Sequence, residues 1–167
     1  MRFDPLSRRP PARAPLLLAL AAACVLGAAY IAQYGFGLDP CRLCLWQRHP
    51  YMAAIALGLL GAGLASRPAH RRGVLAALAL TFLAGAGMAG FHVGVEQGWW
   101  AGLPGCSTPA IEKGMSVEDL RAVLEARTQV VPCDEPAWTL LGISMAGYNA
   151  AVALGLALFA AGAARRR

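Results

Sequence analysis

The sequence predicts an all-α integral membrane protein, a four-helix bundle with a short amphipathic helix in the second of its exterior loops. Of its 167 residues, 57% are apolar and only 14% are charged, whereas about 25% are charged in an ordinary soluble domain. Four long runs contain no Asp, Glu, Lys or Arg, and a membrane-spanning helix needs about 20 such residues. The low charge also argues against a disordered chain and against a nucleic-acid-binding protein.

The four predicted spans are the uncharged runs 15–34, 51–66, 73–95 and 137–164. A helix is expected for each, because every interior N–H group of a helix finds its carbonyl partner within the same segment. The second run is short, and the fourth is long enough to tilt. We interpret the first as an uncleaved helix, since it is longer than the apolar core of a signal peptide. The chain is therefore expected to form a single membrane domain, 1–167.

Basic residues are distributed unevenly among the segments outside these runs. Ten of the fifteen lysines and arginines precede the first run, separate the second from the third, or follow the fourth: Arg2, Arg8, Arg9, Arg13, Arg67, Arg71, Arg72, Arg165, Arg166 and Arg167. The positive-inside rule therefore predicts that both termini are cytoplasmic. Loops 35–50 and 96–136 would then lie on the periplasmic side of a bacterial inner membrane. The net charge of +6 belongs mostly to tails beside anionic lipids of the bilayer, so no nucleic-acid partner is predicted.

Four of the five cysteines lie in the two predicted periplasmic loops, Cys41 and Cys44 in the first and Cys106 and Cys133 in the second, while Cys24 is alone in the first run. An even number of thiols in an oxidising compartment predicts two disulfides, one short-range and one closing a long loop. No metal site is predicted, because the second pair lacks the tight spacing of a zinc ribbon. Turn-forming residues before Cys106 and Cys133 predict that both lie on accessible segments.

The spacing Cys41-Arg-Leu-Cys44 favours redox chemistry over a structural role. A bridge across two residues closes almost no loop and therefore adds little stability. Asp39-Pro40 precedes the pair as a helix start, and a helix N-terminus lowers the pKa of a thiol. The Cys106 and Cys133 pair, by contrast, would also serve as a simple staple of its loop.

Two further residues have both a structural and a functional interpretation. Arg48 lies one helical turn beyond Cys44, where it either snorkels to lipid phosphates or stabilises a Cys44 thiolate and hydrogen-bonds an oxidant dissolved in the membrane. His92, near the end of the third run, is either an ordinary interfacial histidine or a group beside that oxidant. The nearby tryptophans, Trp99, Trp100 and Trp138, are typical of an interfacial aromatic belt.

The second periplasmic loop contains a helix signal of its own. Ser116 begins a capping-box sequence, Ser-Val-Glu-Asp. Val117, Leu120 and Leu124 then follow at helical spacing, with charged residues on the other faces. This pattern predicts the short amphipathic helix.

Together these features resemble the disulfide bond formation protein B family, DsbB, over nearly the whole chain. The motifs are the four helices, Cys-x-x-Cys followed by three residues and Arg48, and the spaced cysteine pair in the second loop. The resemblance implies an enzyme, a quinone-reducing protein-disulfide oxidoreductase that reoxidises a periplasmic DsbA-like thiol oxidase of the thioredoxin fold. Thiol–disulfide exchange only moves electrons between sulfurs. A membrane quinone, ubiquinone or menaquinone, would be their final acceptor.

The resemblance also implies roles for particular residues. Cys106 would form the mixed disulfide with the partner, and Cys133 would resolve toward Cys41. Cys44 would pass the electrons to a quinone held beside Arg48.

His92 is similar, by approximate position, to the quinone-side histidine of the family. Gln47 departs from the best-known family pattern, which has an acid there, so no proton-handling role is implied at this position.

Two alternatives remain open on the sequence alone. One is a related four-helix redox protein with a dedicated partner, or with activity like that of vitamin K epoxide reductase. The missing thioredoxin-like segment and the cysteine pairs in two loops count against it. The other is a non-enzymatic membrane module stapled by disulfides, which predicts inert cysteines.

Overall fold

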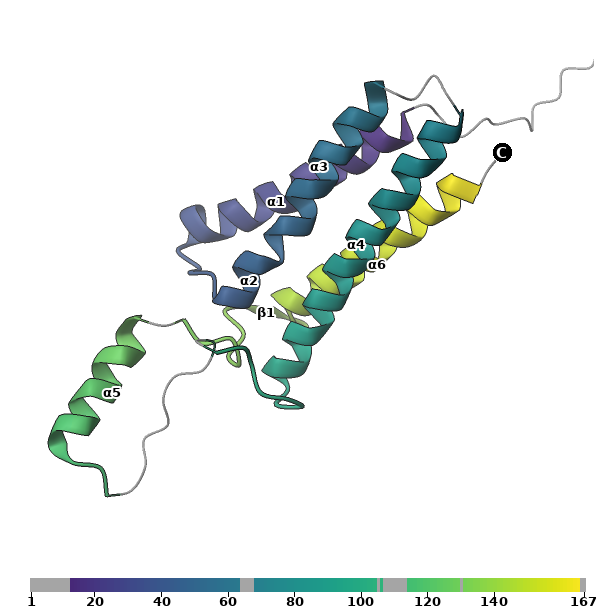
Figure 1. The fold of residues 1–167 in the computed structure, drawn as a ribbon. Coiled ribbons are helices and arrows are strands. Elements are labelled where there is room, and N and C mark those ends of the chain that lie inside the picture. The colour runs from purple at the N-terminus through teal and green to yellow at the C-terminus, as the bar shows by residue number, and fades with distance from the viewer. Residues whose placement is uncertain (1–12, 64–67, 105, 107–113, 130, 166–167) are drawn as a thin grey trace, which may run out of the picture.

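A bundle of four long helices forms the body of the protein (Figure 1). The computed structural model describes residues 13–63, 68–104, 106, 114–129 and 131–165. The long helices are α1 (Ala14–Phe36), α3 (Arg48–Gly63), α4 (Pro68–Glu96) and α6 (Met145–Arg165). Two shorter helices are α2 (Arg42–Trp46), directly before α3, and α5 (Val117–Gln129), between α4 and α6. The predicted all-α membrane bundle is thus confirmed.

Three of the described helices contain segments long and apolar enough to cross a membrane: Ala14–Gly35, Ala69–Glu96 and Met145–Arg165. They correspond to the first, third and fourth predicted spans. The second corresponds to α3, whose 16 residues extend over about 24 Å at the usual helical rise. Residues 64–66 of that predicted span lie outside the described residues. The crossing of α3 and the orientation of the termini stay predictions.

The long helices pack as two pairs, α1 with α3 and α4 with α6, and α3 joins the pairs by packing on α4. Small residues allow the close approach: a Cβ atom at Gly58 of α3 would lie 2.6 Å from the carbonyl oxygen of Pro15 in α1. Between helices in lipid, such close packing is a main source of association free energy. Larger side chains fill the centre of the bundle, namely Leu18, Leu75, Leu78 and Phe82, which are all fully buried.

The turn between α1 and α2 positions the first cysteine pair. Gly37 ends α1 in the left-handed conformation, with φ of 66°, which glycine adopts without steric cost. Cys41 is then the N-cap of α2, and its sulfur accepts the backbone N–H of Cys44. Gln47 separates α2 from α3, so the predicted second helix is two helices that meet beside the cysteines.

The run 137–164 does not begin as a helix, contrary to the prediction. Strands β1 (Thr139–Leu140) and β2 (Ile143–Ser144) form an antiparallel hairpin in which Leu140 pairs with Ile143. Leu141 and Gly142, between the strands, have φ of 51° and 77°, as in the two-residue turns that suit hairpins. An uncharged run does not by itself distinguish a strand from a helix. The hairpin delays α6 until Met145.

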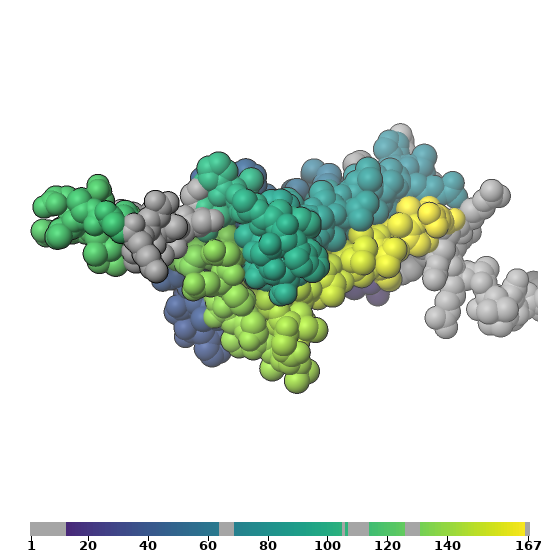
Figure 2. All heavy atoms as spheres, turned by 90° about the horizontal axis from the view of Figure 1, so that it is seen from below, coloured from purple at the N-terminus to yellow at the C-terminus, as the bar shows by residue number. Residues whose placement is uncertain are grey.

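The predicted amphipathic helix is confirmed as α5. The Ser116 hydroxyl oxygen accepts the backbone N–H of Asp119 at 3.1 Å and donates to its carboxylate at 2.7 Å, which is the capping interaction expected from the sequence. The apolar residues Val117, Leu120 and Leu124 are exposed. Figure 2 shows α5 extending away from the bundle at one end of the molecule.

Candidate functional site

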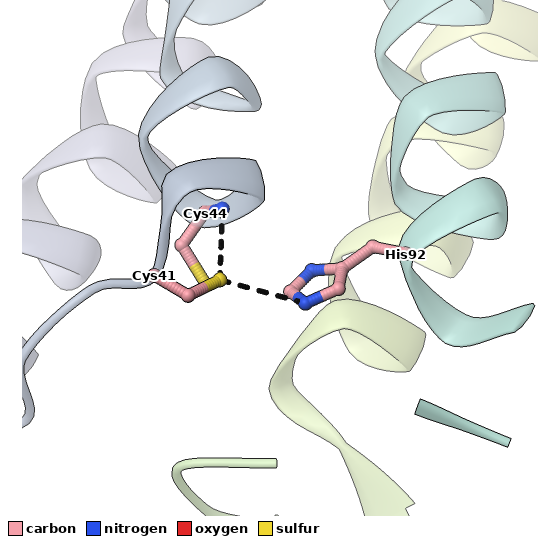
Figure 3. A group of neighbouring side chains, drawn as sticks. All are labelled: Cys41, Cys44 and His92. Carbon is pink, nitrogen blue, oxygen red and sulfur yellow. Dashed lines mark hydrogen bonds between the residues drawn. The ribbon is translucent and has the colours of Figure 1, made fainter. Parts of the chain in front are cut away.

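The first cysteine pair lies at the start of α2 and faces α4 (Figure 3). The sulfur atoms of Cys41 and Cys44 are hydrogen-bonded at 3.0 Å, and the Nε2 atom of His92 lies 3.6 Å from the Cys41 sulfur. The two cysteines are free thiols in this structure, so the predicted short-range disulfide is not formed.

The thiols of this pair have opposite pKa shifts. The hydrogen bond from the Cys44 thiol lowers the pKa of Cys41 to about 4, and the contact with His92 and the Cys44 backbone N–H act in the same direction, while burial opposes them. The same hydrogen bond, together with burial, raises the pKa of Cys44. These hydrogen bonds favour negative charge on Cys41 over Cys44 in the reduced pair, whereas the sequence interpretation of Arg48 placed a thiolate at Cys44.

The second cysteine pair forms the predicted long-range disulfide, Cys106–Cys133. Neither residue is accessible, contrary to the prediction: both are completely buried and pack in one cluster with Cys41, Leu43 and Val95. Turn-forming residues set the direction of the chain but do not decide what packs over it. The backbone N–H of Cys133 also donates to the Cys106 carbonyl at 2.7 Å, so a backbone hydrogen bond joins the same two residues as the disulfide.

His92 lies where the two cysteine pairs meet. Its Nε2 atom is 3.2 Å from the carbonyl oxygen of Cys133, in addition to its contact with Cys41. The Glu96 carboxylate, whose side chain is 4% exposed, lies 3.8 Å from the same nitrogen and accepts the Ser144 hydroxyl. Glu96 was not among the site residues predicted from the sequence. The β1–β2 hairpin supplies its buried partner.

An apolar cavity of about 330 Å³ opens beside Cys44 and Arg48. Its walls come mainly from α1 and α6 and include Val25, Leu26, Ala29, Met145 and Val152. Cys41 does not line this cavity. It lines a smaller one of about 30 Å³, together with Glu96 and Pro132. Cys44 lines both cavities and also packs against the cluster that contains the disulfide, so it is the thiol of the pair that reaches from the disulfide to the large cavity.

Arg48 is buried in the wall of the large cavity, with an exposed fraction of 8%. Its guanidinium carbon lies 4.7 Å from the centre of the Tyr30 ring in α1, a cation–π contact. Within the described part of the chain, no carboxylate forms an ion pair with it. A snorkelling side chain extends to the head groups, so this burial favours the interpretation in which Arg48 faces a ligand of the cavity.

A chain of buried amides leads from the large cavity to His92. The Tyr51 hydroxyl donates to Asn149 Oδ1 at 2.5 Å, and Asn149 Nδ2 donates to Gln47 Oε1 at 2.6 Å. Gln47 Nε2 then lies 2.7 Å from His92 Nδ1. Tyr51 and Asn149 were not among the site residues predicted from the sequence. The available signal was an amide side chain within an apolar helix, which needs a polar partner there.

Cys41, Cys44 and His92 also form the one group found in the described residues that could hold a metal ion, with their ligand atoms within 4.8 Å of one another. Two thiolates and an imidazole suit zinc. However, Nδ1 of His92 faces the amide nitrogen of Gln47, which has only hydrogens to offer. A zinc ion on Nε2 would need the imidazole proton on Nδ1, against this amide nitrogen, so the arrangement suits a thiol pair better than a metal.

Cys24 is not part of this site. It is a free, exposed cysteine of α1, and no described residue of the site contacts it in the hydrogen-bond or disulfide network. Its side chain is exposed and is not packed among the apolar residues of the core.

Comparison with known proteins identifies the family. A family model described as disulfide bond formation protein DsbB matches residues 11–163. "Disulfide bond formation protein B 2" of Pseudomonas syringae is 34% identical over 143 residues, which cover 85% of this chain and 81% of the relative. "Disulfide bond formation protein B" of Xanthomonas axonopodis is 34% identical over 152 residues, covering 89% and 87%. No solved structure matches the chain. The chain therefore belongs to the DsbB family of membrane proteins that function in disulfide bond formation.

Proposed function

We propose that this protein is a quinone-dependent thiol oxidase that reoxidises a periplasmic DsbA-like protein of the thioredoxin fold. One observation carries the proposal: Cys41 and Cys44 both pack with the Cys106–Cys133 disulfide, and of the two only Cys44 also lines a large apolar cavity. A protein that moves electrons from a water-soluble dithiol to a lipid-soluble acceptor needs one thiol on each side. The membrane-embedded helices and the family support the same function.

The first step of this proposal is a thiol–disulfide exchange at the second pair. A thiolate of the reduced partner attacks the Cys106 sulfur, the Cys106–Cys133 bond breaks, and Cys133 leaves as a thiolate. The second thiol of the partner then displaces Cys106, so the partner leaves oxidised and Cys106 and Cys133 hold two electrons. Because both sulfurs are buried, the side chains packed over them, including Leu43 and Val95, must move aside for this attack.

The second step passes the two electrons to the first pair. The Cys133 thiolate attacks Cys41 of an oxidised Cys41–Cys44 pair, Cys44 leaves, and Cys106 then displaces Cys41. The second pair is again a disulfide and the first pair a dithiol. This is the combination of bonded and free cysteines present in the structure.

The residues of the large cavity suit a quinone. Small-molecule pockets commonly measure about 300–1,000 Å³ and have apolar walls with a few polar groups, as this cavity of about 330 Å³ does. A bound ubiquinone or menaquinone supplies an acceptor for two electrons and two protons. Arg48 would donate to one of its oxygens. The Cys44 thiol lines the same cavity as that arginine. When the Cys41–Cys44 bond forms, the Cys44 thiol and the Cys41 thiolate release two electrons and one proton, and the second proton of the quinol comes from solvent.

The proposed cellular setting is a bacterial inner membrane with both termini in the cytoplasm. This orientation follows from the positive-inside rule and places both cysteine pairs in the periplasm, where a disulfide donor operates.

The proposal is tested by anaerobic turnover in lipid nanodiscs, with a reduced DsbA-like protein of the same bacterium and a short-chain ubiquinone or menaquinone. We expect partner oxidation only with quinone present, with one quinol formed per disulfide. Replacing Cys44 by Ala should abolish turnover, whereas Cys24→Ala, the matched control, should leave it nearly unchanged. In a Cys133→Ala variant given the oxidised partner, the free Cys106 thiol should attack the partner's disulfide, displace one of its thiolates and trap the partner as a mixed disulfide.

Oxidation of the partner at the full rate without quinone would overturn the proposal and favour a protein with a different acceptor. Failure of every variant to react with the partner would favour the inert, disulfide-stapled module.

A further inference from the structure

The side chains of Tyr51, Asn149, Gln47 and His92 form a chain of hydrogen bonds, and each bond is donated in the direction from Tyr51 to His92. The Tyr51 hydroxyl donates to Asn149 Oδ1. The amide nitrogen of Asn149 therefore faces Gln47 and donates to its Oε1 atom. The Gln47 oxygen is then engaged, and its Nε2 faces His92 Nδ1 at 2.7 Å. An amide nitrogen only donates hydrogen bonds, so Nδ1 must accept one.

We propose that Tyr51, Asn149 and Gln47 fix the proton of His92 on Nε2, which makes this histidine a hydrogen-bond donor to the Cys41 sulfur and the Cys133 carbonyl. Asn149 and Tyr51 are positioning residues in this proposal, since they act on the thiols only through Gln47 and His92. The inference deepens the proposed function and rests on it for the role of His92 in turnover. The tautomer itself is a property of the resting protein.

The atoms around Nε2 support this assignment. Three acceptors lie near it: the Cys41 sulfur at 3.6 Å, the Cys133 carbonyl at 3.2 Å and the Glu96 carboxylate at 3.8 Å. A nitrogen without hydrogen would place its lone pair against all three. A protonated Nε2 removes this repulsion, and its one hydrogen, shared between the Cys133 carbonyl and the Cys41 sulfur, stabilises negative charge on Cys41.

The chain also explains how position 47 works without an acid. Gln47 is buried, with an exposed fraction of 6%, and both ends of its amide have partners. Because both ends of the Gln47 amide are hydrogen-bonded, its nitrogen donates to His92 Nδ1 and the histidine proton must be on Nε2. Unlike an acid, the neutral amide does this without a buried charge that would need a partner. Because Tyr51 lies on α3, His92 on α4 and Asn149 on α6, the chain also joins three helices at the site.

The direct test is nitrogen-15 NMR of histidine-labelled protein in lipid bilayers. The chain has 3 histidines, and a His92→Gln variant assigns the signals of His92. In the wild type we expect an unprotonated Nδ1 and a protonated Nε2. Asn149→Leu and Tyr51→Phe should each produce a population protonated at Nδ1. In Gln47→Glu, whose side chain offers Nδ1 an acceptor, Nδ1 should become protonated.

Tyr148→Phe is the matched control for Tyr51→Phe. Tyr148 lines the same cavity, but its hydroxyl donates to the Leu140 carbonyl at 3.0 Å and lies outside the amide chain. We expect the His92 signals of this variant to match those of the wild type.

A second readout is the reactivity of the Cys41 thiolate, measured by iodoacetamide alkylation with neither quinone nor partner present. The titratable groups facing Cys41 are Cys44, His92 and Glu96, with Asp39 and Glu135 at the small cavity. Asn149→Leu and Tyr51→Phe leave all of them in place. Loss of the His92 donor should move the midpoint of the Cys41 alkylation profile, near pH 4 in the wild type, to higher pH by up to about one unit, the range for one hydrogen bond.

An Nδ1-protonated His92 in the wild type would overturn the proposal, as would wild-type signals in both Asn149→Leu and Tyr51→Phe. If Asn149→Leu does not fold, Tyr51→Phe, which lacks only one oxygen atom, decides the question. Neither readout needs quinone or partner. The tests of the oxidase activity and of the His92 tautomer can therefore each fail while the other succeeds.

Discussion

At the scale of single residues, the first cysteine pair is asymmetric because of the hydrogen bonds that each sulfur makes. Cys41, the N-cap of α2, accepts from the Cys44 backbone N–H at 3.3 Å, and its sulfur is hydrogen-bonded to the Cys44 sulfur at 3.0 Å. His92 approaches the same sulfur from α4. Cys44 has no such set of donors among the described residues and lines the apolar cavity instead. The pair therefore places its charge on the side of the disulfide and its neutral thiol on the side of the cavity.

This asymmetry predicts different pH profiles for alkylation of the two thiols. Because the pKa of Cys41 is lowered to about 4, its thiolate is present throughout neutral pH. Its alkylation rate should be nearly flat between about pH 5 and pH 8 and should fall only below that range. Cys44 should react slowly up to alkaline pH, because its pKa is raised. Arg42 lies between the two cysteines, so trypsin separates them for measurement by mass spectrometry. A Cys41 rate that rises tenfold per pH unit across neutral pH would contradict the assignment.

Arg48 is the residue at which a structural and a functional role differ most in their consequences. An arginine that binds a quinone oxygen uses its planar, directional donors, which lysine lacks. We expect Arg48→Lys and Arg48→Ala to raise the apparent KM for quinone by about tenfold or more, the effect of one lost hydrogen bond to a charged group. The KM for the thiol partner should hardly change. Steady-state rates against quinone concentration measure both, and an unchanged quinone KM in both variants would make Arg48 an ordinary interfacial residue.

At the scale of elements, the site depends on how closely α1 and α3 approach, since both helices line the large cavity. Gly58 is the point of contact: an added Cβ would lie 2.7 Å from the Ala19 Cβ and 2.6 Å from the Pro15 carbonyl oxygen. The second of these is a backbone atom, which cannot move without shifting α1.

Gly58→Ala should therefore destabilise the protein by about 1–3 kcal/mol, as overpacking does, and should weaken quinone binding as α1 shifts. Gly63→Ala is the control in the same helix, because a Cβ there meets nothing within 4 Å. Its effect should stay within about 0.5 kcal/mol, as for most exposed sites. Thermal unfolding in lipid nanodiscs measures both variants. Equal melting temperatures would show that α1 and α3 do not pack as closely as described.

The helices and strands were not equally predictable from the sequence. Uncharged runs were sufficient for α1 and α4, and the cap at Ser116 was sufficient for α5, because these signals are local. The β1–β2 hairpin and the break at Gln47 escaped prediction, since both lie within or beside apolar runs and depend on backbone conformation. Leu141, for example, is a non-glycine residue with positive φ, which no simple turn motif announces.

At the scale of the whole molecule, the functional site is assembled from residues far apart in the chain. Spacing within the sequence was enough to single out the four loop cysteines, Arg48 and His92. Asn149 and Glu96 could not be found in this way, because their roles arise only when α6 packs on α4 and the hairpin closes over Glu96. Asn149, for instance, contacts Gln47 across 102 positions of sequence.

The orientation of the molecule in the membrane is a separate prediction. In a variant without native cysteines, Ser107→Cys and Ser66→Cys place single thiols in the predicted periplasmic and cytoplasmic loops. A membrane-impermeant thiol reagent applied to intact spheroplasts should label the first and not the second, because the basic residues favour the cytoplasmic side. The reverse pattern would exclude the periplasmic position of both cysteine pairs.

The central claim is that Cys41 and Cys44 together pass two electrons to a membrane quinone. The most direct measurement is a single turnover without the partner: fully reduced protein in nanodiscs receives one equivalent of quinone without oxygen, and quinol and free thiols are counted. We expect one quinol and the loss of two thiols per protein, with no quinol formed by Cys44→Ala. Quinone that stays oxidised beside an unchanged thiol count would contradict the account.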